Sequence, residues 1–341
     1  MTIQRTGIAT WILVCIVLGS VPVVPQESSE QLSADDAIRL REFYRLATRI
    51  QDQIWPKWSA TPVPLLLVTA NTEFLTHHPK PPADFKPIGN DIYACPRQFP
   101  INLLATFPAF GPPWVIVIGE PENTTAKTST PWLITAMHEH FHQLQGAQPG
   151  YLQGVKDLGL SRGDTSGMWM LNYPFPYEKP EIVRSFGDLR DLLLNAVNEA
   201  DPKKFARLAQ QYRQVRKQFF TQLAADDARY FSFQLWYEGV ARYTQIKVAE
   251  AAGAQYHATV EYAALPDYES FASYGAKARA ETLNELKQAD IARWKRTVVY
   301  SFGATEGLLL DRMNPGWKAE YFRHPFSLDT FFETETKPAT K

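Results

Sequence analysis

The chain has 341 residues, of which 45% are hydrophobic and 21% are charged, and its formal net charge is −1 at pH 7. This length allows one large or two small domains with a substantial core, and the composition is that of an ordinary globular protein. Because the charge is near zero and no basic stripe is present, the sequence argues against a partner held through its phosphates, and we expect no nucleic-acid binding.

The first 25 residues have the layout of a secretory signal peptide or an N-terminal anchor. Arg5 precedes an apolar run from Ile8 to Val24, and Gly19, Ser20 and Pro22 interrupt this run. A retained anchor is the alternative, since no A-x-A cleavage site stands out and the run could barely span a bilayer, but we favour cleavage near residues 20–27. We therefore expect a secreted or periplasmic protein, with a membrane tether as the alternative.

Residues 26–128 are expected to form a small α+β lobe. Residues 33–55 carry apolar side chains at helical spacing, with Ser33 as the cap. Short apolar runs then follow between proline-rich loops, which indicates a small sheet. Its strands are expected at residues 64–70, 91–95 and 114–118. His77 and His78 lie in one of the loops, where a solvated pair is favoured over a metal site.

Residues 138–142 read His-Glu-His-Phe-His and contain the pattern H-E-x-x-H. The flanking residues are typical of a helix, because Ser129 or Thr130 can cap its start and Gly146 can end it. The apolar residues between these signals predict a helix over roughly residues 131–145. The pattern therefore lies on a helix, as its chemistry requires.

On such a helix, side chains four positions apart lie on the same face. His138 and His142 can therefore direct ring nitrogens at one metal ion, for which Zn²⁺ is the expected choice. The carboxylate of Glu139 can then reach a water molecule on the ion, where a general base belongs. His140 points away from this face and is interpreted as a neutral packing or hydrogen-bonding residue.

Two imidazoles do not hold zinc tightly, so we expect a third ligand on another element. Glu238 is the best candidate, because it stands in an otherwise apolar stretch where a carboxylate needs a partner. The small residues Gly239 and Ala241 would let its helix approach the first one closely. Without a metal, Glu238 would pair with a nearby arginine. Other carboxylates considered for the third ligand are Glu199, Glu178, Glu181 and Asp164.

Three segments together resemble the gluzincin metallopeptidases, in particular the aminopeptidase N branch and its glycyl-aminopeptidase relatives. They are the H-E-x-x-H motif, the sequence Glu-Gly-Val-Ala at 238–241, and the sequence Tyr-Ser-Phe-Gly at 300–303. The resemblance implies a zincin-like fold with zinc held by the two histidines and Glu238. It also implies that Tyr300 donates a hydrogen bond to the oxyanion of the tetrahedral intermediate. Judged without the resemblance, Tyr300 would be a packing residue.

The chain departs from this family in several places. The interval between His142 and Glu238 is far longer than usual, so an insertion is expected within the helical residues 181–229. Tyr237 stands where the family often has asparagine. The sequence Gly-Glu-Pro-Glu-Asn at 119–123 is only loosely similar to the segment that grips a substrate amino terminus, so exopeptidase specificity is not implied.

Residues 129–333 are expected to form a mainly helical, zincin-like catalytic region, which makes the whole chain α+β with the motif helix between its two parts. The aromatic-rich residues 146–180 either fold over the cleft as part of the substrate wall or simply pack. Residues 203–224 have a helical pattern. Residues 334–341 are expected to be a disordered tail.

The sequence thus predicts a zinc metallopeptidase acting on a peptide or protein. In this reading Glu139 takes a proton from the zinc-activated water and passes it to the leaving amine, and Tyr300 supports the oxyanion. Two alternatives stay open. One is a catalytically inactive zincin-like protein that binds peptides, and the other is a membrane-tethered envelope protein.

Overall fold

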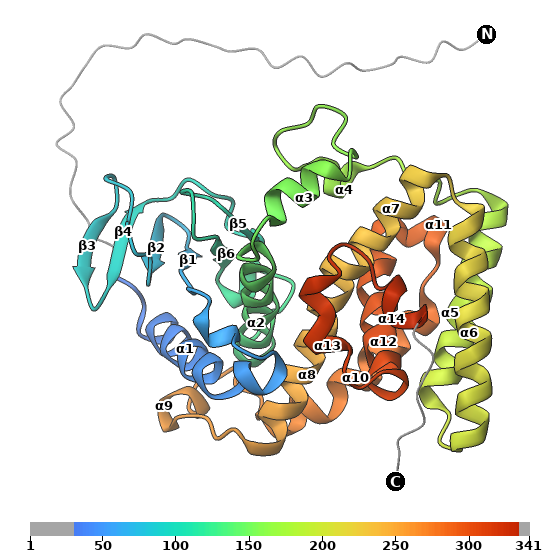
Figure 1. The fold of residues 1–341 in the computed structure, drawn as a ribbon. Coiled ribbons are helices and arrows are strands. Elements are labelled where there is room, and N and C mark those ends of the chain that lie inside the picture. Colours follow the sequence, from blue (N-terminus) through green and yellow to red (C-terminus); the bar gives the residue numbers. More distant parts are fainter. Residues whose placement is uncertain (1–30, 334–341) are drawn as a thin grey trace, which may run out of the picture. The chain divides into compact units, whose positions relative to one another are not determined.

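A computed structural model describes residues 31–333 of the protein. The expected signal peptide or anchor at residues 1–25 and the expected tail at residues 334–341 lie outside the described residues. Within them, a six-stranded mixed sheet is followed by a mainly helical region, which confirms the expected α+β class (Figure 1). None of the described helices combines the length and apolar character needed to cross a membrane.

The sheet contains three strands that the sequence predicted and three that it did not. The strands are β1 Leu65–Val68, β2 Thr72–Thr76, β3 Lys86–Gly89, β4 Ile92–Pro96, β5 Leu104–Phe107 and β6 Val115–Gly119. Their order is β3-β4-β2-β1-β6-β5, and only β1 and β6 run parallel. The unpredicted strands β2, β3 and β5 are short and contain polar residues or proline, so pairing with neighbouring strands decides their conformation.

Helices make up most of the rest of the chain. They are α1 Ala34–Ile54, α2 Ser129–Gly146, α3 Tyr151–Asp157, α4 Trp169–Asn172, α5 Pro180–Asn198, α6 Pro202–Gln222, α7 Ala225–Gln234, α8 Val240–Gln255, α9 Val260–Ala263, α10 Phe271–Gln288, α11 Ile291–Trp294, α12 Val298–Met313, α13 Trp317–Glu320 and α14 Asp329–Glu333. Single turns are η1 Trp58–Ala60, η2 Pro121–Asn123, η3 Leu235–Gly239, η4 Lys295–Thr297 and η5 Tyr321–Arg323. The predicted helices correspond to α1, α2 and α6, and Ser33 caps α1 as expected.

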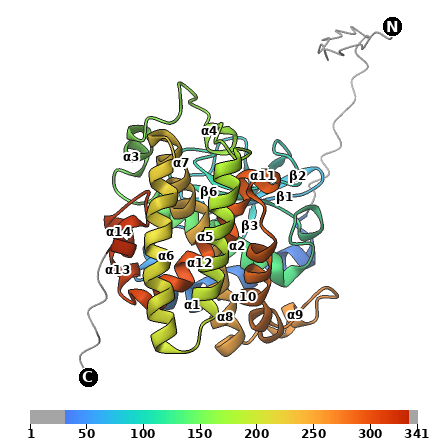
Figure 2. The same ribbon diagram turned by 90° about the vertical axis from the view of Figure 1, so that its right-hand side faces the viewer.

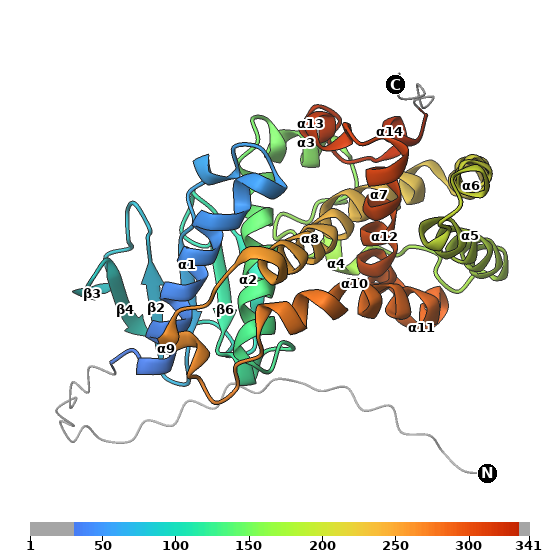
Figure 3. The ribbon, with the colours of Figure 1, turned by 90° about the horizontal axis from the view of Figure 1, so that it is seen from below.

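The side chains of the central strands alternate between two apolar clusters, as the twofold period of a strand requires. Leu65 and Leu67 of β1 face the main core with α1 and α2, whereas Leu66 and Val68 join a smaller cluster on the other face. Figure 3 shows α1 and α2 beside the strands. Helix α2 also contacts α8, so it lies between the sheet and the helical region, as the sequence predicted.

The long interval between the two halves of the motif holds α3 to α7. Helices α5 and α6 form a pair that lies side by side in Figure 2. A buried ion pair fastens this pair to α12, since Arg216 Nε donates to Glu306 Oε1 over 2.6 Å. The helical insertion expected at 181–229 therefore packs onto the region that follows. The division of the chain at residue 128 stays a prediction.

The aromatic side chains of residues 146–180 are buried. They are Tyr151, Trp169, Tyr173, Phe175 and Tyr177. Three of them stack on α7. The ring centroids are 5.7 Å apart for Trp169 and Phe233, 4.2 Å apart for Tyr173 and Tyr230, and 5.3 Å apart for Phe175 and Phe231. Packing therefore accounts for these rings, and the role of the segment as a substrate wall stays a prediction.

Candidate metal centre

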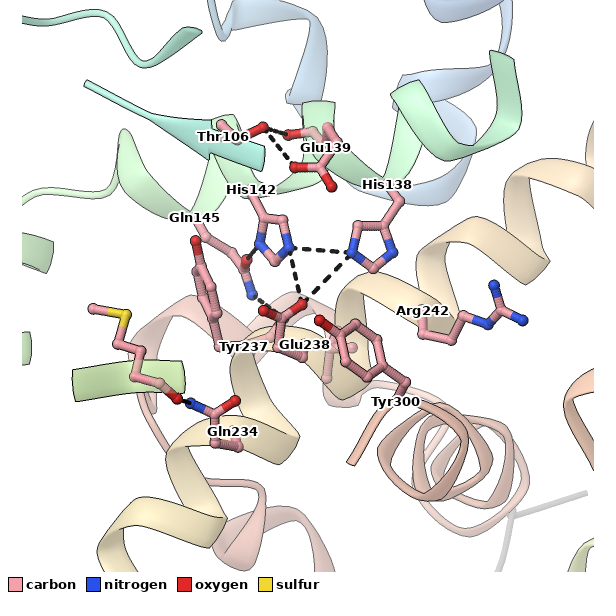
Figure 4. Close-up of polar contacts among 12 residues, drawn as sticks. Thr106, His138, Glu139, His142, Gln145, Gln234, Tyr237, Glu238, Arg242 and Tyr300 are labelled. Atoms are coloured by element: carbon pink, nitrogen blue, oxygen red, sulfur yellow. Dashed lines mark hydrogen bonds and ion pairs between the residues drawn. The ribbon is translucent and has the colours of Figure 1, made fainter. Parts of the chain in front are cut away.

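Three side chains that the sequence singled out as metal ligands come together at the boundary between α2 and the helical region. One nitrogen from His138, one from His142 and one carboxylate oxygen from Glu238 all lie within 4.8 Å of one another. Figure 4 shows the two imidazole rings pointing down from α2 and the carboxylate pointing up from η3. Both histidines are buried, and the Glu238 side chain is 12% exposed.

The spacing of these atoms fits one small ion. The Nε2 atoms of His138 and His142 lie 3.2 Å apart. Glu238 Oε2 lies 3.3 Å from Nε2 of His142 and 3.7 Å from Nε2 of His138. Donors held tetrahedrally at about 2.0–2.1 Å from an ion lie about 3.3 Å from one another. The described residues contain no second such group of three His, Cys, Asp or Glu side chains.

The start of helix α2 is held by a residue from a later part of the chain. Its start is capped neither by Ser129 nor by Thr130, which corrects the sequence prediction. Instead, the carboxylate of Asp267 accepts hydrogen bonds from the Ser129 amide over 2.8 Å and from the Ser129 hydroxyl over 2.7 Å. Asp267 comes from the loop before α10, so sequence alone gives no sign of this cap. An acidic group at a helix N-terminus also interacts favourably with the helix dipole.

Glu238 lies in a π-helical turn. In η3 the amide of Val240 donates to the carbonyl of Leu235, five residues earlier, rather than four as in an α-helix. Such a turn contains one extra residue, which changes the direction of the following side chains and often marks a functional site. The sequence predicted that the small Gly239 and Ala241 let this helix approach α2 closely. Helix α8, which carries Ala241, does contact α2, but Gly239 itself packs against Gly303 of α12.

Gln145 fixes the protonation of His142. The amide nitrogen of Gln145 donates to the Tyr237 carbonyl over 3.1 Å and to the Tyr321 hydroxyl over 2.8 Å. Its oxygen therefore faces Nδ1 of His142, 2.7 Å away, and must accept a hydrogen bond there. Because Nδ1 keeps its proton for Gln145, Nε2 is the nitrogen whose lone pair can bind a metal ion, and without an ion Nε2 can donate a hydrogen bond to Glu238. A ring with its proton held on Nδ1 is the form that a metal ligand needs.

The two other histidine rings of α2 differ from His142 in their partners. Nδ1 of His138 is buried and has no hydrogen-bond partner among residues 31–333. His140 points to the other side of the helix, where its ring nitrogens contact Gln143 and Gln51, each over 2.8 Å. Burial lowers the pKa of His140 to about 4, so it stays neutral, as expected from the sequence.

Glu139 lies beside the histidine pair, on the side of β5. Thr106 of β5 donates its hydroxyl to Glu139 Oε2 over 2.8 Å, and the same hydroxyl lies 3.0 Å from the Glu139 carbonyl (Figure 4). The Glu139 side chain is thus held on one oxygen. Sequence reasoning missed Thr106, because a single threonine in an unpredicted strand carries no signal of its own.

Tyr300 of α12 lies on the other side of the group. Its ring stacks over that of His138, with centroids 6.3 Å apart, and its hydroxyl points toward Glu238 (Figure 4). Arg296, which the sequence did not single out, contacts both residues. Its Nη1 lies 3.4 Å from Glu238 Oε1, and its Nη2 donates to the Tyr300 hydroxyl over 3.1 Å. The arginine partner considered for Glu238 is therefore present beside the histidines rather than instead of them.

Electrostatics link the members of this group. Burial by itself raises the pKa of Glu238, but its hydrogen bonds to His138 and His142 outweigh burial, so the pKa lies well below its usual value. For His142, burial lowers the pKa, and the neighbouring charge of Glu238 more than compensates, so the pKa is raised. Glu238 is therefore ionised, as a metal-ligating carboxylate must be.

The competing carboxylates do not join the group. Glu178 pairs with Lys295 over 3.1 Å at the surface, and Asp164 accepts hydrogen bonds within its own turn. Glu199 likewise accepts from the nearby Asp201 amide. The loop histidines are not a solvated pair, because His78 is buried and accepts from the Lys80 amide.

In comparisons with known proteins, no family model, no curated protein and no solved structure matches this chain.

Proposed function

We propose that the protein is a zinc-dependent metallopeptidase with a zincin-like arrangement of the gluzincin type. The observation that carries this proposal is the convergence of His138, His142 and Glu238 at the spacing of a tetrahedral ion, with Glu139 alongside. Two imidazoles and one carboxylate are a common ligand set for catalytic zinc, which keeps its fourth position for water. The ionised Glu238 and the lone pair of His142 suit this ion.

The proposed mechanism assigns a separate task to each residue. When bound, zinc would polarise the scissile carbonyl and lower the pKa of its water to about 7. Glu139, held on one oxygen by Thr106, accepts the proton of the water and delivers it to the leaving amine. Tyr300 donates its hydroxyl hydrogen to the oxyanion, an interaction commonly worth about 3 kcal/mol in the transition state.

A peptide is the favoured substrate because of the strand beside Glu139. β5 stands at the end of the strand order, and among residues 31–333 it pairs only with β6. An extended peptide can add to such an edge through main-chain hydrogen bonds. Bound along β5, its backbone would pass Thr106 and hence the catalytic carboxylate. We propose a peptide or protein substrate for this reason.

The proposed setting is secreted or periplasmic, with residues 1–25 either removed or retained as a membrane tether. This part of the proposal depends on the sequence alone. Mass determination of the protein exported from cells distinguishes the two forms.

The function is tested by elemental analysis followed by incubation with a mixture of unrelated peptides. We expect one zinc per chain and cleavage products that disappear after chelation. The variant Glu238→Gln should lose stoichiometric zinc, because an amide oxygen is a weaker donor than a carboxylate, whereas Glu181→Gln on the surface of α5 should keep it. A parent chain without zinc contradicts the proposal. Zinc without cleavage of any peptide favours an inactive, peptide-binding relative.

A further inference from the structure

Arg296 contacts three side chains around the candidate metal centre. Its Nη1 lies 3.2 Å from Gln234 Oε1 and 3.4 Å from Glu238 Oε1, and its Nη2 lies 3.1 Å from the Tyr300 hydroxyl. The side chain is 18% exposed. A planar guanidinium can hold two acceptors in fixed directions, which a lysine ammonium cannot do. One group therefore connects the third ligand with the proposed oxyanion donor.

The two oxygens of Glu238 face different partners. Oε2 lies toward His138 and His142, whereas Oε1 lies toward Arg296. A carboxylate with one oxygen bound to arginine has only the other oxygen free for a metal. Glu238 would then occupy one position on the ion instead of two, and the position for water would stay open.

The backbone before Arg296 adopts a conformation that costs free energy. Lys295 has φ 51° and ψ −129°, a positive-φ conformation that is unfavourable for a residue with a side chain. Asp290 caps the short helix α11 just before it, and Lys295 itself pairs with Glu178 over 3.1 Å. These contacts hold the turn that carries Arg296 toward the site at the start of α12.

We propose that Arg296 is a positioning residue of the metal centre, which restricts Glu238 to single-oxygen ligation and fixes the hydroxyl of Tyr300 beside it. This inference depends on the proposed function. Because a positive charge next to the ion opposes binding, removal of Arg296 should leave the affinity for zinc unchanged or higher. A residue that served only the fold would lower affinity and stability when removed.

The experiment compares Arg296→Met and Arg296→Lys with the parent chain, after replacement of zinc by Co²⁺. Four-coordinate Co²⁺ absorbs visible light more strongly than five-coordinate Co²⁺. We expect the parent to give the strong bands and Arg296→Met to give the weaker ones, because Glu238 can then bind through both oxygens. Arg293→Met is the matched control, since Arg293 is exposed three residues earlier, and its spectrum should equal that of the parent.

Peptide cleavage provides the second readout. Arg296→Met should lower kcat by about 10–100-fold with little change in KM, as expected when a group around a metal site is lost. Arg296→Lys should lose as much, because the ammonium cannot contact Glu238 and Tyr300 together. Full activity in Arg296→Lys would show that only the positive charge at position 296 matters, and it would overturn the positioning role.

The failure of this inference is separable from that of the proposed function. If the parent binds zinc and Arg296→Met retains both its Co²⁺ spectrum and its kcat, only the inference is wrong. Weaker zinc binding by Arg296→Met also contradicts it. If the parent binds no metal, the proposed function fails and the inference fails with it. The Co²⁺ spectrum needs no substrate, so it decides the ligation even if no peptide is cleaved.

Discussion

Gly239 and Gly303 touch each other, and this contact places Glu238 beside Tyr300. A Cβ atom added to Gly239 would lie 2.6 Å from Cα of Gly303 and 3.1 Å from the carbonyl oxygen of Val299. The neighbouring atoms belong to the backbone of α12, so they cannot rotate away. The turn η3 and helix α12 can therefore approach this closely only because both residues are glycine.

We predict that Gly239→Ala separates η3 from α12. The strain of an added methyl group in a tight interior costs typically about 1–3 kcal/mol, so the free energy of unfolding should fall by that order. Peptide cleavage should fall with it, since Glu238 and Tyr300 move apart. Denaturant titration measures the first effect, and the rate of peptide cleavage measures the second.

Gly187→Ala supplies the control for this substitution. Gly187 lies in α5 with no atom near the position of an added Cβ. Alanine is a better helix former than glycine, so this variant should be more stable by about 0.5–1 kcal/mol. If Gly239→Ala were as stable and active as Gly187→Ala, the close contact would have no role.

Local signals were enough to predict helix α2, the metal ligands of its motif, and Glu238 as the third ligand, because a carboxylate is unexpected in so apolar a stretch. The pattern H-E-x-x-H has meaning only on a helix, and the apolar flanks predict that helix. Other members of the site have no local signal. Gln145 and Arg296 are ordinary polar residues in sequence, and only the tertiary fold gives them partners. The contact of Gly239 with α12 rather than α2 could not be predicted for the same reason, because a glycine indicates close packing without naming the partner.

The same limit applies to the sheet. β1 and β6 are apolar runs that stand out by themselves, whereas β5 becomes a strand because it pairs with β6. Thr106, which holds Glu139, came from this unpredicted strand. Asp267, which caps α2, comes after α8 in the sequence, far from the start of α2 that it contacts. Sequence analysis therefore missed the residues that gain their role from contacts with distant parts of the chain. It found the residues that are recognised by their spacing along one helix.

Gln145→Met should weaken zinc binding without unfolding the protein. Methionine has a similar size but offers His142 Nδ1 no carbonyl oxygen, so the ring loses its fixed tautomer and orientation. Loss of such an outer partner typically lowers metal affinity by about 10–100-fold. Competition with a zinc chelator measures the change. Gln148→Met, one turn later and outside the site, should bind zinc like the parent, and an equal loss in both variants would contradict the role of Gln145.

Glu120, at the end of β6, should make stability depend on pH. Burial, followed by the nearby charges of Asp36 and Glu122, raises the pKa of Glu120 from 4.5 to about 7. The unfolded chain therefore loses this proton at lower pH than the folded chain does. The stability that protonated Glu120 contributes to the fold is complete below pH 4.5, declines as the pH rises, and is lost above about pH 7.

Glu120→Gln removes this titration while keeping the shape of the side chain. We expect the variant to be more stable than the parent at pH 8, and we expect this difference in stability to be smaller at pH 4. Thermal unfolding at a series of pH values measures the difference. If the two proteins keep a constant difference in Tm from pH 4 to pH 8, then Glu120 titrates normally in the fold.

Glu139→Gln provides the sharpest separation between metal binding and chemistry. Glu139 is next to the ligands without being one of the three, and it is held by Thr106 on one oxygen. An amide of the same size can keep the contact with the Thr106 hydroxyl but cannot accept the proton of the water. Zinc content should therefore stay at one per chain while kcat falls by about 10²–10⁴-fold, the usual contribution of a general base. Thr106→Val should lower kcat less, because the base remains and only its anchor is lost. If Glu139→Gln lost the zinc, Glu139 would be a ligand, and the division of roles between Glu139 and Glu238 would be wrong.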